Sequence, residues 1–404
     1  MKHLKSIILL LFVSTGIFAQ SINAQFKRKN EIDNLLTSIS KNNPLPTFVV
    51  GGVNKSGLFY QYNHGNKIWS GKTPINENHI FRIYSMTKAI TSVAALQLVE
   101  QGKLQLDEPL DKLMPEMASI PILTKDGKLV KATKSITLRH LLTHTAGFGY
   151  PFFSDGLDKF TKNMPANYAY ADLPRLFEAG SSWQYGTNTD WVGKIVEKVS
   201  GKDLETYFRD NILQPLGMTR TFFNVPNELV SEISTFGQLN GDHFVADTVS
   251  QYKDLHLKTF SGGGGLFSTL KDYAQFIRCI LNDGTLNNHQ IIKKSTVDLM
   301  FTNNIGELLT TVNDPSPNYS FLINPKTTFL GANKYSVAWA IDQTGRKNIQ
   351  NAGTAYWCGV GNTFYSIDRK KGEAVLFFSN SFPLGNSFTE ELYYNAEGAI
   401  YNLK

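Results

Sequence analysis

A serine and a lysine three residues apart offer the clearest chemistry in this sequence. Ser85 and Lys88 stand where a short β-like run passes into an apolar helical pattern that stops at Gly102. Residues three apart on a helix are neighbours, so the Lys88 amine can take the Ser85 proton as that hydroxyl attacks a carbonyl carbon. Burial would keep such a lysine partly neutral. Since the first turn of a helix also has unpaired N–H groups, the spacing predicts a nucleophile, a base and half of an oxyanion hole.

On its own this pattern is weak, because a helix cap followed by a solvated lysine produces it as well. Two later stretches add to it. Tyr185 lies in a turn with Gly186 just before an apolar helix, and its phenol can relay a proton if a lysine holds it near ionisation, although a packed aromatic is the simpler interpretation. Trp357, Cys358 and Gly359 open a strand, where a backbone N–H can act as a second oxyanion donor.

Two other motifs resemble ligand sites at first sight. His140 and His144 are four apart, as on a zinc-binding helix, but Leu141 stands in place of the glutamate and no third ligand is evident. A short helix capped by Thr137 is the simpler account. The glycine run 262–265 lacks the Gly-Lys-Ser/Thr ending of a phosphate loop and is better explained by close backbone approach to a groove. The sequence therefore predicts no metal site and no cofactor.

Residues 1–24 have the pattern of a secretory signal peptide. Lys2 and Lys5 precede an apolar run, and Ala19 and Ala24 offer cleavage sites. The run is short for a transmembrane helix, and an uncleaved N-terminal anchor is the competing interpretation. We therefore expect export to the periplasm or secretion, with no stable membrane insertion once the signal is removed.

Composition narrows the range of partners. The chain has 404 residues, of which 42% are hydrophobic, and a formal net charge of +6. The basic clusters 27–29 and 369–371 are too short for a nucleic-acid-binding stripe, so nucleic acid is not an expected partner. Cys279 and Cys358 are expected to be buried and free, although export would permit a disulfide between them. The sequence gives no indication of oligomeric state.

Hydrophobic periodicity predicts an α+β fold. Helical spacing over 25–41 and two strand-like runs begin the chain, and three strand-like runs and a helix end it. This order predicts one antiparallel sheet built from both chain ends, flanked by helices, with a mainly helical region inserted. We assign 25–404 to a single domain, with its sheet part in about 25–84 and 330–404 and the helical insertion in about 85–329. The predicted strands are 47–53, 57–62, 335–341, 362–367 and 374–379, the last helix is about 389–401, and 313–325 is predicted to be an exposed loop.

Taken in chain order, several motifs together resemble the serine β-lactamase and penicillin-recognising superfamily, in its esterase-like branch near class C β-lactamases and family VIII carboxylesterases. The resemblance covers about residues 45–380 and implies the β-lactamase/transpeptidase-like fold. The motifs are Ser-Met-Thr-Lys at 85–88, Leu-Leu-Thr-His-Thr-Ala-Gly at 141–147, Tyr185 ahead of Asp-Trp-Val-Gly at 190–193, Pro-Leu-Gly-Met-Thr at 215–219, the stretch 262–269, and Gly-Asn-Thr-Phe-Tyr-Ser-Ile-Asp at 361–368.

The resemblance implies an acyl-enzyme mechanism. Ser85 would attack the substrate, Lys88 and Tyr185 would share base and proton-relay work, and the oxyanion would lie between the backbone N–H groups of Ser85 and Val360. On the same resemblance the two histidines stay structural.

This chain departs from the β-lactamase pattern at two substrate-binding positions. The second β-lactamase motif is Tyr-x-Asn, whereas here Thr187 takes the third position and Asn188 follows one residue late. The third motif there is Lys-Thr-Gly, whereas Trp357 and Gly359 resemble the Trp-x-Gly of the esterases; the segment 351–353, Asn-Ala-Gly, is a competing register. Loss of the lysine weakens recognition of anionic substrates, and an indole offers an apolar wall instead.

These departures favour an exported carboxylesterase that acts on short-chain esters. A class C-like β-lactamase or a D,D-peptidase is the alternative, since it would use the same Ser85, Lys88 and Tyr185. A poorly catalytic, penicillin-binding-like sensor that forms a stable acyl adduct is the third possibility. The expected partner is therefore a small-molecule ester, or a β-lactam or peptide substrate.

Overall fold

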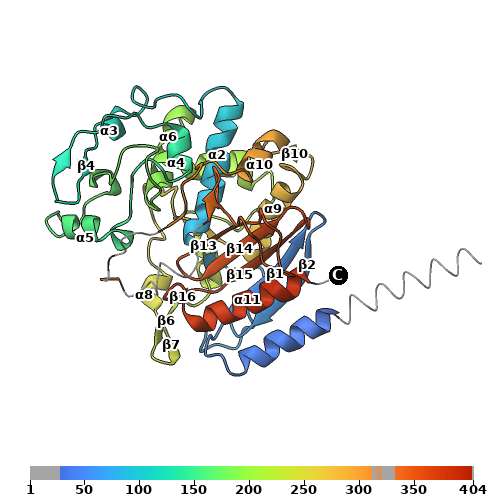
Figure 1. Ribbon diagram of the computed structural model, residues 1–404. Helices are drawn as coiled ribbons and strands as arrows, with labels where there is room; N and C mark the ends of the chain where they lie inside the picture. Colours follow the sequence, from blue (N-terminus) through green and yellow to red (C-terminus); the bar gives the residue numbers. More distant parts are fainter. Residues whose placement is uncertain (1–27, 312–315, 317, 320–332, 403–404) are drawn as a thin grey trace, which may run out of the picture.

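The computed structural model describes residues 28–311, 316, 318–319 and 333–402 (Figure 1). The predicted signal peptide, 1–24, and most of the predicted loop 313–325 lie outside these ranges. Among the helices in the described ranges, none is long and apolar enough to cross a membrane.

A seven-stranded antiparallel sheet organises the chain, in the order β11-β12-β13-β14-β15-β1-β2. The N-terminal strand β1 lies between its hairpin partner β2 and the C-terminal strand β15, with Val50 opposite Phe377 and Gly51 opposite Leu376. Both chain ends therefore build one sheet, which confirms the predicted α+β class. The strands are β1 (Phe48–Asn54), β2 (Leu58–His64), β11 (Lys334–Tyr335), β12 (Ala340–Ile341), β13 (Ala355–Gly359), β14 (Thr363–Asp368) and β15 (Glu373–Phe378).

The prediction of one strand over 335–341 is wrong. The run folds back on itself as the short hairpin of β11 and β12, with Tyr335 opposite Ala340. The Ser336 hydroxyl accepts hydrogen bonds from the backbone N–H groups of Ala338 and Trp339, at 3.1 and 3.2 Å. A serine that satisfies two backbone donors in this way favours a turn over a continuous strand.

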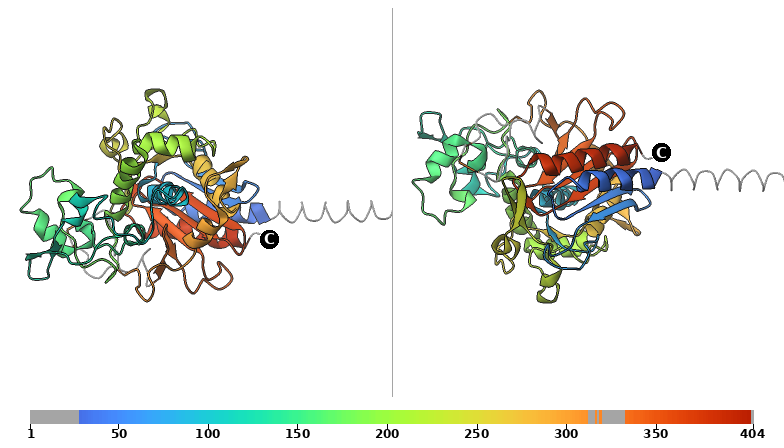
Figure 2. Two further views of the ribbon diagram at one scale, coloured as in Figure 1. Left: turned by 90° about the horizontal axis from the view of Figure 1, so that it is seen from above. Right: turned by 90° about the horizontal axis from the view of Figure 1, so that it is seen from below.

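Helices cover both faces of the sheet (Figures 1 and 2). The helix α9 (Leu270–Leu281) packs on one face, and α11 (Ser387–Tyr401) lies on the other beside the helical residues 28–40. Two adjacent glycines in β1 permit this close approach. A side chain at Gly51 would meet Leu270 of α9, and one at Gly52 would meet Ile400 of α11. The sheet is therefore sandwiched between helices at its centre.

The helix α2 (Thr87–Glu100) runs through the middle of the molecule. Its residues 87–98 are all buried, including polar ones such as Lys88 and Gln97, so this part of the helix has no solvent face. It packs against α6 (Asn188–Ser200) and α7 (Leu204–Phe208). The serine and lysine of the sequence motif are therefore placed at the end of a rigid, fully packed element.

The remaining elements, in chain order, are β3 (Phe81–Arg82), η1 (Tyr84–Met86), α3 (Pro115–Ala118), β4 (Ile122–Leu123), β5 (Leu129–Val130), α4 (Leu138–Leu142), η2 (Pro151–Phe153), α5 (Asp155–Thr161), η3 (Tyr170–Asp172), η4 (Arg209–Leu213), η5 (Asn227–Glu232), β6 (Gly237–Asn240), β7 (His243–Ala246), α8 (Thr248–Gln251), β8 (Phe267–Ser268), β9 (Thr285–Leu286), β10 (His289–Gln290), α10 (Lys294–Met300) and β16 (Ser381–Phe382).

Candidate active site

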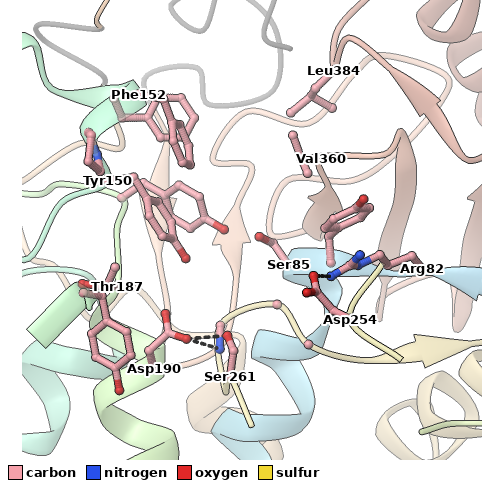
Figure 3. Close-up of a pocket in the computed structure, with 18 of the residues that line it drawn as sticks. Arg82, Ser85, Tyr150, Phe152, Thr187, Asp190, Asp254, Ser261, Val360 and Leu384 are labelled. Carbon is pink, nitrogen blue, oxygen red and sulfur yellow. Dashed lines mark hydrogen bonds and ion pairs between the residues drawn. The ribbon is translucent and has the colours of Figure 1, made fainter. Parts of the chain in front are cut away.

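Ser85 lies in the single turn η1 that precedes α2, at the edge of a cavity (Figure 3). The preceding residue, Tyr84, has φ of +44°, a left-handed conformation that is uncommon for an aromatic residue. The Tyr273 hydroxyl donates to the Met86 carbonyl at 3.0 Å, and this hydrogen bond holds the turn in place. This sharp turn presents the Ser85 hydroxyl to the cavity while α2 stays in the core.

Lys88 is 1% exposed and its amine points back at Ser85. Its Nζ donates to Ser85 Oγ at 3.2 Å, to the Gly263 carbonyl at 2.6 Å and to Tyr150 Oη at 3.2 Å. Burial lowers the pKa of Lys88 to about 8, against the opposing attraction of the Asp190 carboxylate. An amine with such a pKa is partly neutral near pH 7 to 8 and can accept the serine proton.

Tyr185 lies on the other side of the same amine. The Lys88 Nζ is 4.8 Å from the centre of the Tyr185 ring. Burial raises the pKa of the Tyr185 phenol, which the Ser85 hydroxyl and the Trp357 indole oppose in part. A phenol with a raised pKa keeps its proton, so Tyr185 is suited to deliver a proton and Lys88 to accept one.

A second phenol, Tyr150, reaches the site and was not predicted from the sequence. Its hydroxyl accepts the Lys88 hydrogen bond, and its ring lies 5.5 Å from that of Tyr185. Burial raises its pKa well above the usual value, so it too is neutral. The available signal was a tyrosine between Gly149 and Pro151 directly after the 141–147 motif, because such a turn can present a side chain.

The glycine run and Asp190 fix the lysine from the far side. The Asp190 carboxylate accepts from the Ser261 hydroxyl at 2.5 Å and from the Gly263 backbone N–H at 3.1 Å. A side chain at Gly262 would meet the Thr189 carbonyl oxygen. The run therefore serves close backbone approach, as predicted, and supplies the carbonyl oxygen that receives Lys88.

The end of β13 reaches the same cavity. Trp357 and Val360 both line it, and the Trp357 ring is 5.0 Å from that of Tyr185. Gly359 is not among the lining residues; a side chain there would overlap the Ile83 carbonyl oxygen and the Thr363 hydroxyl. Its predicted contact with substrate is thus replaced by a close approach of β13 to the turn that precedes Ser85.

The second and third residues after Tyr185, Thr187 and Asn188, point in different directions. Thr187 lines the cavity, whereas Asn188 is fully buried and does not. Asn188 Nδ2 donates to the Phe148 carbonyl at 2.8 Å and lies 3.1 Å from His144 Nδ1. The prediction that Asn188 binds substrate is therefore corrected: as the first residue of α6, its amide is turned into the protein.

The two histidines have separate partners. His140 forms a capping box with Thr137, the predicted cap of α4. His144 packs 4.9 Å from the Tyr185 ring, and burial together with the Lys88 charge lowers its pKa well below the usual value. His144 is thus a neutral ring that supports Tyr185 from behind. Within the described residues, no three His, Cys, Asp or Glu side chains form a group able to hold a metal ion.

Two further sequence alternatives are settled by contacts. Cys279 and Cys358 are both buried and free. The competing register at 351–353 points away from the cavity, since Asn351 donates its side-chain amide to Asp368 at 2.8 Å. The Trp357 register is the one that reaches the cavity.

The cavity has a volume of about 940 Å³, and both aromatic and charged side chains line it (Figure 3). Rings dominate its lining, whereas its charged lining side chains are three carboxylates and one guanidinium among the described residues. A large apolar hollow with few polar groups is typical of a small-molecule site. The ring-bearing lining residues are Tyr84, Tyr150, Phe152, Phe153, Tyr168, Tyr170, Tyr185, Tyr319, Trp357 and Phe382, and the charged ones are Arg82, Asp190, Asp247 and Asp254.

The sequence is similar to those of several known proteins. The beta-lactamase family model matches residues 42–400. The monacolin J acid methylbutanoyltransferase of Aspergillus terreus is 29% identical over 353 residues, which is 81% of this chain and 83% of that protein. The lovastatin esterase of Penicillium rubens is 32% identical over 257 residues, 58% of this chain and 62% of that protein.

Two solved structures superpose closely. The unliganded simvastatin synthase of Aspergillus terreus has a TM-score of 0.76 at 26% identity, covering 92% of this chain and 98% of that one. EstCE1, described as a hydrolase with promiscuous acyltransferase activity, shares the fold with a TM-score of 0.74 at 21% identity, covering 94% of this chain and 99% of that one. The fold and its relatives define a serine-hydrolase-type enzyme with esterase and acyltransferase relatives. This chain belongs to the beta-lactamase family.

Proposed function

We propose that this enzyme cleaves short-chain carboxylic esters through an acyl-enzyme on Ser85. The observation that carries the proposal is the buried Lys88 amine, which donates to Ser85 Oγ at 3.2 Å and has its pKa lowered to about 8. Such a lysine is a base poised next to a nucleophile.

The chemistry begins when Ser85 Oγ attacks the ester carbonyl carbon and its proton moves to the neutral Lys88 amine. The tetrahedral oxyanion would accept hydrogen bonds from the N–H groups of Ser85 and Val360. Collapse breaks the bond to the leaving alcohol, which takes a proton from Tyr185 or Tyr150, and Lys88 returns a proton to that phenol. Water then attacks the acyl-enzyme by the reverse route, which releases the acid and restores Ser85.

The walls of the cavity favour esters over β-lactams and D,D-peptides. Both alternatives present a carboxylate, yet Trp357 stands where the family's β-lactamases carry a lysine. The described lining residues include Asp190, Asp247 and Asp254, and the guanidinium among them, that of Arg82, is paired with Asp254 at 2.7 Å. A substrate carboxylate would lie close to these carboxylates, and the described lining residues offer it no unpaired cation. Coulomb repulsion would therefore weaken its binding.

Acyl transfer to a second alcohol is the other candidate function. The volume of about 940 Å³ leaves room for an acceptor beside a short acyl group. It is also supported by the relative named as a methylbutanoyltransferase. In that case an acceptor alcohol replaces water in the second step, and the acyl-enzyme would react faster with the alcohol than with water.

Export is part of the same proposal. Residues 1–24 carry the charged start, apolar run and small residues of a signal peptide. The mature enzyme would then act in the periplasm or outside the cell. Intact mass of the protein recovered from fractionated producing cells tests this. Loss of the first 19 or 24 residues is expected, and a full-length membrane-bound chain would contradict it.

The activity is tested with 4-nitrophenyl butyrate and nitrocefin side by side, on wild type and Ser85→Ala, with intact mass spectrometry of each mixture. We expect rapid ester turnover that Ser85→Ala abolishes, and little nitrocefin cleavage. Addition of a bulky alcohol would reveal transfer as a new ester product. Efficient nitrocefin turnover would favour the β-lactamase instead, and a lasting adduct without turnover would favour the sensor.

A further inference from the structure

Among the described residues that line the cavity, Arg82 is the one side chain that is a cation, and it is held in an ion pair with Asp254. In Figure 3, Ser85 lies between Tyr150 and Phe152 on one side and the Arg82–Asp254 pair on the other. Arg82 belongs to β3, which pairs with β8, and it precedes the nucleophile by three residues. A substrate group that extends to this side of the cavity would therefore contact the Arg82–Asp254 ion pair.

The guanidinium is held in place but keeps donor capacity. It lies 5.0 Å from the centre of the Tyr84 ring and 5.4 Å from that of Phe267. Its Nη2 donates to Asp254 at 2.7 Å and its Nη1 to the Lys253 carbonyl at 3.4 Å, while Nε is buried with no hydrogen-bond partner among the described residues. Although the buried Nε is inaccessible, Nη1 and Nη2 each carry a second N–H, so the guanidinium is suited to a second carboxylate provided that its charge is free.

We propose that Asp254 is a specificity-determining residue that neutralises Arg82 and so excludes substrates that carry a carboxylate near the ester. This inference rests on the proposed esterase function and names the substrates within it: neutral esters are accepted and anionic ones are disfavoured. Without the Asp254 charge, Arg82 would hold a substrate carboxylate by charge-assisted hydrogen bonds.

Neighbouring charges act in the same direction. Asp247 also lines the cavity, and hydrogen bonds from the Ser250 hydroxyl and backbone N–H hold its pKa below the usual value.

Asp254 itself has φ of +58°, in the left-handed region. Asparagine adopts this conformation readily, so Asp254→Asn removes the charge while it preserves the local backbone and a hydrogen-bond acceptor.

The experiment measures kcat/KM for two matched pairs of esters. One pair places the charge on the acyl side, as mono-4-nitrophenyl glutarate against 4-nitrophenyl pentanoate. The other places it on the leaving group, as 3-carboxyphenyl butyrate against phenyl butyrate. For Asp254→Asn we expect the anionic-to-neutral ratio to rise about tenfold or more over wild type in at least one pair, because a positive charge is unmasked at short range.

Two further variants separate charge from structure. Arg82→Gln in the Asp254→Asn background should return the ratio to the wild-type level or below it. Arg82→Gln alone should lower the ratio, since it leaves the Asp254 carboxylate unpaired. The matched control is Asp242→Asn, which removes one charge from a side chain 97% exposed at the β6–β7 turn and should leave the ratio unchanged.

The outcomes distinguish two failures. If wild type turns over neutral esters in a Ser85-dependent manner but Asp254→Asn leaves both ratios unchanged, this inference is wrong and the proposed function stands. An equal rise in the Asp242→Asn control would also overturn it, because net charge alone would then explain the effect. If no ester is turned over at all, the proposed function and this inference fall together.

Discussion

The floor and the outer wall of the cavity are built in different ways. The floor is lined by Ser85, Tyr185 and Gly263, with the Lys88 amine buried beneath them, and it rests on the buried residues 87–98 of α2 and on close backbone contacts. The outer wall, formed by segments such as 150–153 and 168–170 with Tyr319, comes from loops and single turns. This difference implies that backbone packing fixes the positions of the catalytic groups. The choice of substrate depends instead on side chains of the outer wall, which can be substituted one at a time.

The largest effect is expected at the floor, from Lys88→Met. The substitution retains an apolar stem but removes the base, so kcat/KM with 4-nitrophenyl butyrate should fall by at least about 10³-fold. Stability should change little, because the lost bond to the Gly263 carbonyl is offset by removal of a buried amine. Thermal melting and initial rates test both parts, with exposed Lys103→Met as the control. A near-wild-type rate would mean that another group is the base.

The pH dependence of the floor follows from the same lysine. Since burial lowers the pKa of Lys88 to about 8, the neutral base accumulates as pH rises through this value. We expect kcat/KM to climb about tenfold per pH unit below 8, so that the rate at pH 6 is about a hundredfold below the plateau. The Asp190 carboxylate raises this pKa, so Asp190→Asn should move the midpoint to lower pH. A pH profile that is flat, or that falls between pH 6 and 9, would refute the assignment.

The sequence predicted the floor better than the wall, for a physical reason. Ser85 and Lys88 are three residues apart, so the geometry of one helical turn brings them together. Tyr185 was recognisable because it lies in a turn just before a helix. The wall has no such short-range signature. Tyr150, Asp254 and Tyr319 line the same cavity only because the chain between the two parts of the sheet packs around α2, so in the sequence each was a separate loop residue.

The sheet shows the same division between local and distant signals. Strand periodicity located β1, β2, β14 and β15, because each is one uninterrupted strand of six or seven residues. It failed at 335–341, where the hydroxyl of Ser336 breaks the run into a hairpin through two local hydrogen bonds. Hydrophobicity alone does not report such a turn.

An intermediate effect is expected where β13 meets the floor. In Gly359→Ala the new methyl group would overlap the Ile83 carbonyl oxygen and displace the end of β13, and with it Val360, which follows directly. We expect a loss of about tenfold to a hundredfold in kcat, because one oxyanion donor shifts, and a destabilisation of about 1–3 kcal/mol. Gly398→Ala on α11 is the matched control, since its nearest neighbour would be 3.8 Å away. It should leave kcat unchanged, and equal losses in both variants would disprove the local explanation.

The smallest effect is expected at the wall, through a carboxylate that does not touch the cavity itself. Asp158 of α5 is 5% exposed and accepts hydrogen bonds from Ser316 Oγ at 2.9 Å, Asn318 Nδ2 at 2.5 Å and Tyr319 Oη at 2.9 Å. Tyr319 in turn lines the cavity and lies 5.9 Å from the Phe152 ring. Asp158 therefore contributes to the position of this part of the wall.

Asp158→Asn replaces one acceptor oxygen with a donor and removes the charge, so the bond at that position must reverse its direction or break, and the remaining bonds lose their charge assistance. We expect KM for a bulky ester such as 4-nitrophenyl 4-phenylbutyrate to rise about three- to tenfold, which corresponds to about 1 kcal/mol, with a smaller change for 4-nitrophenyl acetate. Asp155→Asn on the same helix, which loses only a surface ion pair with Lys159, is the control. An equal fall in kcat for both esters would show that wall and floor are coupled, and that the wall is not an independent determinant of substrate size.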